Sequence, residues 1–273
     1  MLVALFYGQK MPAALAQGGV DHFCPECHQN VRKRKRRGYV PHFYHLVKSN
    51  CANSGESLEH ENAKNDIAEE FSGRGHGAEI ECTIIEDLKA RDRLIWFNRS
   101  VIDQIASRRA DVIVRKSKKT GVQSYAVEIQ GVSLSRAEFA GRCNDWEEYG
   151  VPVLWLAILP KILRKRFKQR AVEGGPVKIE RYAPRPFERW IVARSGELWF
   201  YEPELRVAFL VKFQPHVLHV GPKVFWDPSA GNMVETDGYD KVSERYVDLL
   251  VAPQVRLNEL LIDASQKIAR WTT

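Results

Sequence analysis

The chain has 273 residues, of which 44% are hydrophobic and 27% charged. This is the composition of an ordinary globular protein with one substantial core and room for a smaller second one. It excludes a membrane protein, because no apolar run approaches the roughly 18 residues of a membrane span. No basic leader precedes the mildly apolar start, so we expect a cytoplasmic protein without a membrane partner. The net charge of +7 favours a polyanionic partner.

Residues 1–53 are turn-rich and cationic, and we expect them to form an N-terminal zinc-binding module. The stretch FCPEC is a C-x2-C turn whose two thiolates can both bind Zn²⁺. An odd number of cysteines, five, favours thiols and metal over disulfides. A later cysteine and one histidine should complete a closed structural site, with His42, which follows a proline, as the alternative histidine. The predicted ligands are Cys24, Cys27, His45 and Cys51.

Six consecutive cations, RKRKRR, lie between the two halves of the predicted zinc site. A strand or loop held by zinc can present them to phosphates, which gives salt-sensitive binding without sequence preference. A solvated charge run and a nuclear-localisation-like signal are the alternatives. The neighbouring metal site favours contact with DNA, with RNA as a second choice. The cations are Arg32, Lys33, Arg34, Lys35, Arg36 and Arg37.

Residues 54–172 are expected to form an α/β domain. Apolar periodicity predicts helix, three strands, helix and strand, and Ser135 with Glu138 fits a capping box at the second helix. Because a strand–helix–strand crossover closes this order, at least one strand pair must be parallel. The predicted elements cover residues 57–75, 78–85, 108–116, 124–130, 133–150 and 151–159.

Two carboxylates, Asp111 and Glu128, lie on neighbouring predicted strands. Because strand side chains alternate, Glu128 and Gln130 share one face, and Val127 and Ile129 the other. Strand pairing could bring Asp111 and Glu128 to one cation, with the carbonyl of Ile129 and waters completing the oxygen environment that Mg²⁺ or Mn²⁺ prefers. Such an ion polarises a phosphate and lowers the pKa of a bound water. The alternative, favoured by spacing alone, is two solvated carboxylates on a sheet face.

The order of elements, with Asp before Glu-x-Gln, resembles the PD-(D/E)XK nuclease superfamily, and residues 20–156 resemble the competence-protein CoiA-like family. The matching stretches are FCPEC, VPHFYH, Cys51, SLEHENAK, RRADV, AVEIQ with LS after it, the helix from Arg142 to Tyr149, and GVPVLWL. The resemblance implies a restriction-endonuclease-like α-β-β-β-α-β core and a metal-dependent nuclease acting on DNA. By it, Asp111 and Glu128 bind the metal and Gln130 fills the usual lysine position.

A glutamine at this position carries no charge, whereas a lysine stabilises the negative phosphorane. We expect Lys64 to supply the missing cation and His60 to orient a phosphate or water, because both lie on one face of the first predicted helix. The alternative is that Lys64 extends to solvent from a packed helix. By resemblance, Glu61 is an extra candidate ligand. Arg142 on the second helix either contacts the DNA backbone or packs.

Residues 187–273 are expected to form a β-rich C-terminal domain, behind a Gly- and Pro-rich linker at 174–186. Residues 188–203 predict a hairpin with Ser-Gly at its turn, and 205–220 one or two further strands. Apolar spacing over 257–271 predicts an amphipathic terminal helix. The clustered aromatics either stack on bases or, more simply, fill a β core.

Three functions fit these patterns. The first is a Mg²⁺- or Mn²⁺-dependent DNA nuclease that grips its substrate through the zinc module. The second is a non-catalytic DNA-binding accessory protein on a nuclease fold, which Glu-x-Gln would suit. The third is an interaction protein that recruits partners through its C-terminal domain. The joint placement of Asp111, Glu128, His60 and Lys64 favours the nuclease.

Overall fold

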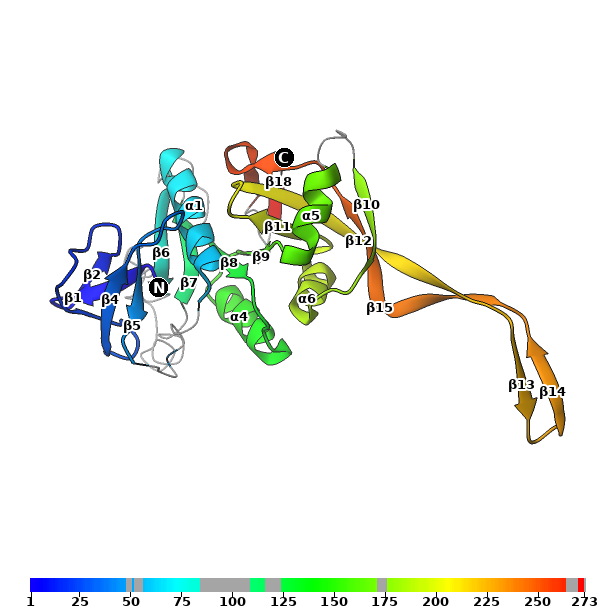
Figure 1. The fold of residues 1–273 in the computed structure, drawn as a ribbon. Coiled ribbons are helices and arrows are strands. Elements are labelled where there is room, and N and C mark those ends of the chain that lie inside the picture. Colours follow the sequence, from blue (N-terminus) through cyan, green and yellow to red (C-terminus); the bar gives the residue numbers. More distant parts are fainter. Residues whose placement is uncertain are drawn as a thin grey trace.

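Two sheets of unequal size dominate the computed structural model (Figure 1). The N-terminal residues form a five-stranded sheet, and most of the remaining chain builds a nine-stranded sheet. Among the helices that the structure describes, none is long and apolar enough to cross a membrane. The described residues are 1–47, 51, 56–83, 109–115, 124–170, 176–263 and 270–272.

The N-terminal sheet is antiparallel, with strand order β2-β1-β3-β4-β5. Its first hairpin turns at Tyr7 and Gly8, both with positive φ, as a tight two-residue hairpin turn requires. The core of this sheet is small and includes Cys24, with Cys27 and Cys51 packed against it. The strands are β1 (Val3–Phe6), β2 (Gln9–Pro12), β3 (His22–Phe23), β4 (Asn30–Arg34) and β5 (His42–His45).

The central part follows the predicted succession of elements. Ser57 caps the first helix by accepting a hydrogen bond from the His60 N–H, and the capping box of Ser135 and Glu138 opens the second. The last two strands run parallel, with Glu128 opposite Trp155. The elements are α1 (Leu58–Gly73), β6 (Gly77–Thr83), β7 (Arg109–Arg115), β8 (Tyr125–Gln130), α4 (Arg136–Glu148) and β9 (Val153–Ile158).

The second half of the chain extends the same sheet. β11 pairs in parallel with β9, and the order across the sheet is β10-β15-β12-β11-β9-β8-β7-β6, with β16 attached to β12. The elements are α5 (Lys161–Arg170), β10 (Val177–Tyr182), α6 (Pro186–Ser195), β11 (Leu198–Glu202), β12 (Val207–Val220), β13 (Lys223–Asp227), β14 (Asn232–Thr236), β15 (Tyr239–Val251), β16 (Val255–Arg256), η4 (Leu257–Glu259), β17 (Leu261–Asp263) and β18 (Arg270–Thr272).

Helices cover both faces of the large sheet. On one face, α1 buries Ile67 and Phe71 against alternate residues of β7, β8 and β9. On the other, α4, α5 and α6 bury a larger cluster that includes Trp146 and Trp155. Because successive residues of a strand alternate between the two faces of the sheet, each residue of β8 faces either α1 or α4.

Two expectations for the C-terminal half are wrong. The expected linker contains strand β10, and the expected hairpin at 188–203 is helix α6 followed by β11. Pro186 occupies the first helical turn, and Glu188 accepts a hydrogen bond from the Arg185 N–H at 2.7 Å, so the segment begins as a helix. The Ser-Gly pair ends that helix, because Gly196 adopts φ 79° as its C-cap.

The expected terminal helix is also wrong for the residues that the structure describes. Residues 257–259 form a single 3₁₀ turn, and β17 pairs with β18. Leu257 and Leu260 are buried in the cluster beneath α1, and Arg74 donates hydrogen bonds to the carbonyls of both. The apolar residues of this stretch therefore anchor a segment without an α-helix to α1.

Candidate functional site

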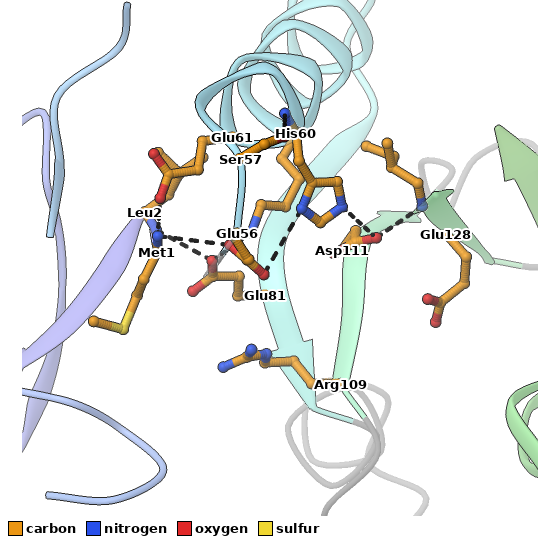
Figure 2. Close-up of polar contacts among 12 residues, drawn as sticks. Met1, Leu2, Glu56, Ser57, His60, Glu61, Glu81, Arg109, Asp111 and Glu128 are labelled. Atoms are coloured by element: carbon orange, nitrogen blue, oxygen red, sulfur yellow. Dashed lines mark hydrogen bonds and ion pairs between the residues drawn. The ribbon is translucent and has the colours of Figure 1, made fainter. Parts of the chain in front are cut away.

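Asp111, His60 and Glu56 lie together where β7, the start of α1 and the preceding loop meet (Figure 2). The β7–β8 pairing ends at Val112, so the Asp111 carboxylate is free to accept a hydrogen bond from the Ile129 N–H at 2.7 Å. His60 Nε2 lies 3.2 Å from Asp111 Oδ2, and His60 Nδ1 lies 3.8 Å from Glu56 Oε1. One ligand atom from each of the three residues lies within 4.8 Å of the others.

Both carboxylates of this cluster are held ionised. Burial alone would raise the pKa of Asp111, but the neighbouring His60, Lys64 and the Ile129 N–H hold it well below its ordinary value. Burial likewise opposes ionisation of Glu56, yet Lys64 and His60 outweigh it and lower the pKa of that carboxyl to about 2. Two ionised carboxylates and one imidazole at this spacing form a donor set that suits a divalent cation.

Glu128 is fully buried and faces α4. Its carboxylate accepts hydrogen bonds from Arg142 Nη1 at 2.8 Å and from Trp146 Nε1 at 2.9 Å. In Figure 2 no contact joins it to Asp111 or His60. Burial raises the pKa of Glu128, Arg142 counteracts this, and Asp111 adds to the rise. The structure therefore joins the Asp111 carboxylate to His60, whereas the Glu128 carboxylate is held by Arg142 and Trp146 of α4.

Gln130 shares the α4 face with Glu128, as its position two residues along the strand predicts. Its side-chain amide donates a hydrogen bond to the Val132 carbonyl at 2.8 Å, and the side chain is buried. It therefore fixes the turn that follows β8.

Lys64 does not extend to solvent. It is completely buried, and its Nζ lies 2.6 Å from Glu56 Oε2 and 2.7 Å from Glu81 Oε1. Burial opposes the charge, but Glu81 and Glu56 raise the pKa of Lys64 above its ordinary value. Glu81 sits at positive φ in β6, between the pairs that Ile80 and Cys82 form with Val112 and Ala110 of β7. Lys64 thus reaches the Asp111 cluster through Glu56.

Glu61 lies outside the Asp111 cluster. It is buried against the N-terminal sheet, where it contacts the Met1 nitrogen, and its Oε2 lies 3.5 Å from His42 Nδ1. Glu56, which the sequence analysis did not select, occupies the position that was expected for Glu61. Because Glu56 precedes the N-cap, helical periodicity does not include it. Its spacing of four residues from His60 was the available signal.

Replacement of Lys64 by Met is expected to lower the free energy of unfolding by about 3–5 kcal/mol. The substitution leaves the partly buried Glu56 and the buried Glu81 without their shared cation, and an uncompensated buried charge carries a penalty of that size. Urea unfolding at neutral pH measures the change. The exposed Lys165→Met is the control, and Lys64→Met with Glu81→Gln should recover part of the loss. A loss below about 1 kcal/mol would contradict this ion-pair role.

The four predicted zinc ligands lie close together beside strands β3 and β5 of the N-terminal sheet. One ligand atom from each lies within 4.8 Å of the others, with Cys27 Sγ 3.2 Å from His45 Nε2 and Cys24 Sγ 3.7 Å from Cys51 Sγ. His42 faces Glu61 and the Val40 carbonyl instead. Three thiols and one imidazole are a set typical of structural zinc.

The cluster of three cysteines and His45 is linked to the strand that carries Asp111. Glu26, between the first two cysteines, lies 3.1 Å from a guanidinium nitrogen of Arg109 at the start of β7. Arg32 and Arg34 project from β4 to the same exposed side as Tyr44, and the Arg34 guanidinium lies 5.9 Å from the Tyr44 ring. The three cations that follow, 35–37, are exposed in the turn to β5.

Residues 100–173 match the family model described as the nuclease-like domain of competence protein CoiA. The match contains Asp111, Glu128, Gln130 and Arg142, and it confirms the family resemblance for this part of the chain. The cysteine cluster and α1 lie outside the matched residues. No match was found among curated proteins or solved structures.

Proposed function

Because residues 100–173 carry the nuclease-like domain of the CoiA family, we propose that the chain is a metal-dependent nuclease that hydrolyses DNA on a restriction-endonuclease-like core. The observation that carries the proposal is the ionised Asp111 carboxylate beside His60 and Glu56, at the end of the β7–β8 pairing. Neither the nuclease-type fold nor a site of this composition requires residues from the C-terminal half of the sheet. The two observations are therefore consistent with each other.

Asp111, Glu56 and His60 would hold Mg²⁺ or Mn²⁺. Such an ion supplies Lewis acidity toward a phosphate and lowers the pKa of a bound water. The Ile129 N–H fixes the orientation of the Asp111 carboxylate, and the Lys64 ammonium keeps Glu56 ionised at neutral pH. In this role Lys64 acts through Glu56 and not by direct contact with the phosphate.

Glu128 and the carbonyl of Ile129 remain proposed additional ligands. Glu128 lies on the adjacent strand, and the nearby Asp111 charge raises its pKa, so a shared cation would relieve the repulsion between the two carboxylates. Its present partners, Arg142 and Trp146, would then have to release it. Arg142 is partly exposed and would be free to contact the DNA backbone.

We propose that the zinc module holds the substrate. A Zn²⁺ on the three cysteines and His45 would fix the β4–β5 hairpin, where Arg32, Arg34 and residues 35–37 are exposed cations suited to phosphates, while Lys33 donates a hydrogen bond to the Ala16 carbonyl. The contact between Glu26 and Arg109 ties this hairpin to the strand of Asp111. DNA bound along the cations would therefore stay in a defined position relative to the carboxylate cluster.

Incubation with linear, circular and single-stranded DNA in Mg²⁺, Mn²⁺ or EDTA tests the proposal. We expect cleavage that requires the metal, is abolished by EDTA, and falls at high salt as phosphate contacts weaken. Cleavage of the circular form would identify an endonuclease.

A non-catalytic DNA-binding protein is the second candidate. Two observations favour it: Glu128 is held by Arg142 and Trp146, and Gln130 supplies no charge. It predicts salt-sensitive DNA binding of the zinc module without cleavage in either metal, which the same incubation distinguishes.

A further inference from the structure

A two-stranded ribbon projects from the large sheet. β12 and β15 stay paired well beyond the strands that flank them in the sheet, from Pro215 opposite Val247 to Val220 opposite Tyr239. The hairpin of β13 and β14 continues this ribbon at its far end, and Figure 1 shows it extending away from the rest of the molecule. We refer to residues 214–246 as the arm.

The neck of the arm is closely built. A Cβ at Gly238 would lie 3.1 Å from the Val220 carbonyl oxygen and 3.4 Å from Pro222, so a larger residue would crowd the chain where the strands of the ribbon meet the tip hairpin. The register of the tip is complete from Lys223 opposite Thr236 to Asp227 opposite Asn232. The arm is therefore a regular β-hairpin with a defined register.

Apolar side chains of the arm are exposed on both of its faces. Between 48% and 62% of each side chain is accessible, and none belongs to a core cluster of the described residues. An isolated two-stranded ribbon is marginally stable in water, and a group of this size on a soluble domain is typical of an interaction surface. The residues are Val217, Val224, Phe225, Trp226, Met233, Tyr239 and Val242.

The charge of the arm is opposite to that of the remaining chain. It contains three lysines and arginines against five aspartates and glutamates, so its net charge is −2. The whole chain has 41 basic and 34 acidic residues, which leaves 38 against 29, or +9, outside the arm. An acidic arm is poorly suited to bind DNA, but it complements the basic surface of another copy of this protein.

We propose that the arm clasps a second copy of this chain, with its apolar tip packed on the second copy and its carboxylates facing basic residues there. Exchange of two arms about a two-fold axis makes the contact reciprocal, so each copy gives and receives one arm. This arrangement covers the exposed apolar side chains of both arms and closes the assembly at two copies.

The mass of the full chain in solution tests the proposal, in the absence of DNA. Sedimentation velocity of the protein is expected to give about twice the monomer mass of 31.3 kDa. Phe225→Ser with Trp226→Ser should raise the dimer dissociation constant roughly 100-fold, because buried aromatic anchors dominate such contacts. Glu235→Lys with Asp240→Lys should weaken the dimer as well, most strongly at low salt.

The control replaces two apolar residues elsewhere that are more exposed than Phe225 and Trp226, Leu15→Ser with Ile162→Ser, and this variant should remain dimeric. Far-UV circular dichroism checks that the arm variants keep their fold. A wild-type protein that is monomeric at 100 times the concentration used for cleavage assays would overturn the proposal. So would an arm variant that dimerises like the wild type. Neither result depends on nuclease activity.

Discussion

Asp111→Asn is expected to lower metal-dependent DNA cleavage by roughly a thousandfold or more, because a bound divalent cation contributes several kcal/mol of transition-state stabilisation. The amide keeps an oxygen that can accept from the Ile129 N–H, so the local fold should be preserved. What is lost is the negative charge beside His60 and Glu56 that would hold the cation. DNA binding, which we assign to the zinc module, should change little. Cleavage rates and DNA affinity measured by fluorescence anisotropy in EDTA separate the two effects.

Asp66→Asn is the matched control for this substitution. The Asp66 carboxylate is as exposed as that of Asp111, 13% in each case, and it also carries specific contacts, to the Tyr201 hydroxyl at 2.8 Å and to Arg206. It lies on α1 but outside the carboxylate cluster, so its neutralisation should leave cleavage near the wild-type rate. Full cleavage by Asp111→Asn would instead place the chemistry elsewhere in the chain.

The core of the large sheet could be read from local patterns. Continuous or alternating apolar runs predicted β6 to β9, the i, i+4 stripe predicted α1, and the capping box located the start of α4. The parallel β8–β9 pair followed from the crossover alone. These features depend on periodicity and on local hydrogen bonds, both of which the sequence records directly.

The direction in which the Glu128 side chain points could not be predicted from such patterns. Alternation predicted correctly that Glu128 and Gln130 share a face, but it does not indicate which helix covers that face. The partners Arg142 and Trp146 come from α4, whose packing is a tertiary property. Asp111 contacts His60 of α1 beside the point where the β7–β8 pairing ends, and no residue pattern marks that point.

The same limit explains Lys64 and the C-terminal half. The charge of Lys64 suggested a solvent-facing or phosphate-facing role, but two distant carboxylates, Glu56 and Glu81, bury it. The Ser-Gly pair at 195–196 suits a hairpin turn and a helix C-cap equally well, and the packing of Phe187 and Ile191 on the sheet decides between them. In contrast, the grouping of the three cysteines with His45 was predictable, because C-x2-C spacing is a local signature.

Cys27→Ser is expected to abolish stoichiometric zinc and to unfold the N-terminal sheet. The core of this sheet has few buried side chains, and three of the four cluster residues are cysteines within or against it. A module of this size depends on its metal, since structural zinc contributes about 10–16 kcal/mol of apparent binding free energy in small zinc-binding peptides. Metal content by mass spectrometry and limited proteolysis within residues 1–47 measure the two effects. DNA affinity should fall with them, because the β4–β5 cations lose their fixed positions.

Cys143→Ala is the control, since this thiol is buried in the core of the large sheet, whereas Cys24 belongs to the separate core of the N-terminal sheet. It should keep one zinc per chain and the protease resistance of residues 1–47. Zinc retained by Cys27→Ser would remove Cys27 from the ligand set. A wild-type protein that binds no zinc would mean that packing around Phe43 and Val31 alone holds the sheet. The Glu26–Arg109 contact joins this sheet to β7, so loss of zinc should also slow DNA cleavage at the Asp111 cluster. Cleavage by wild-type protein that is first treated with a zinc chelator and then supplied with Mg²⁺ measures this effect.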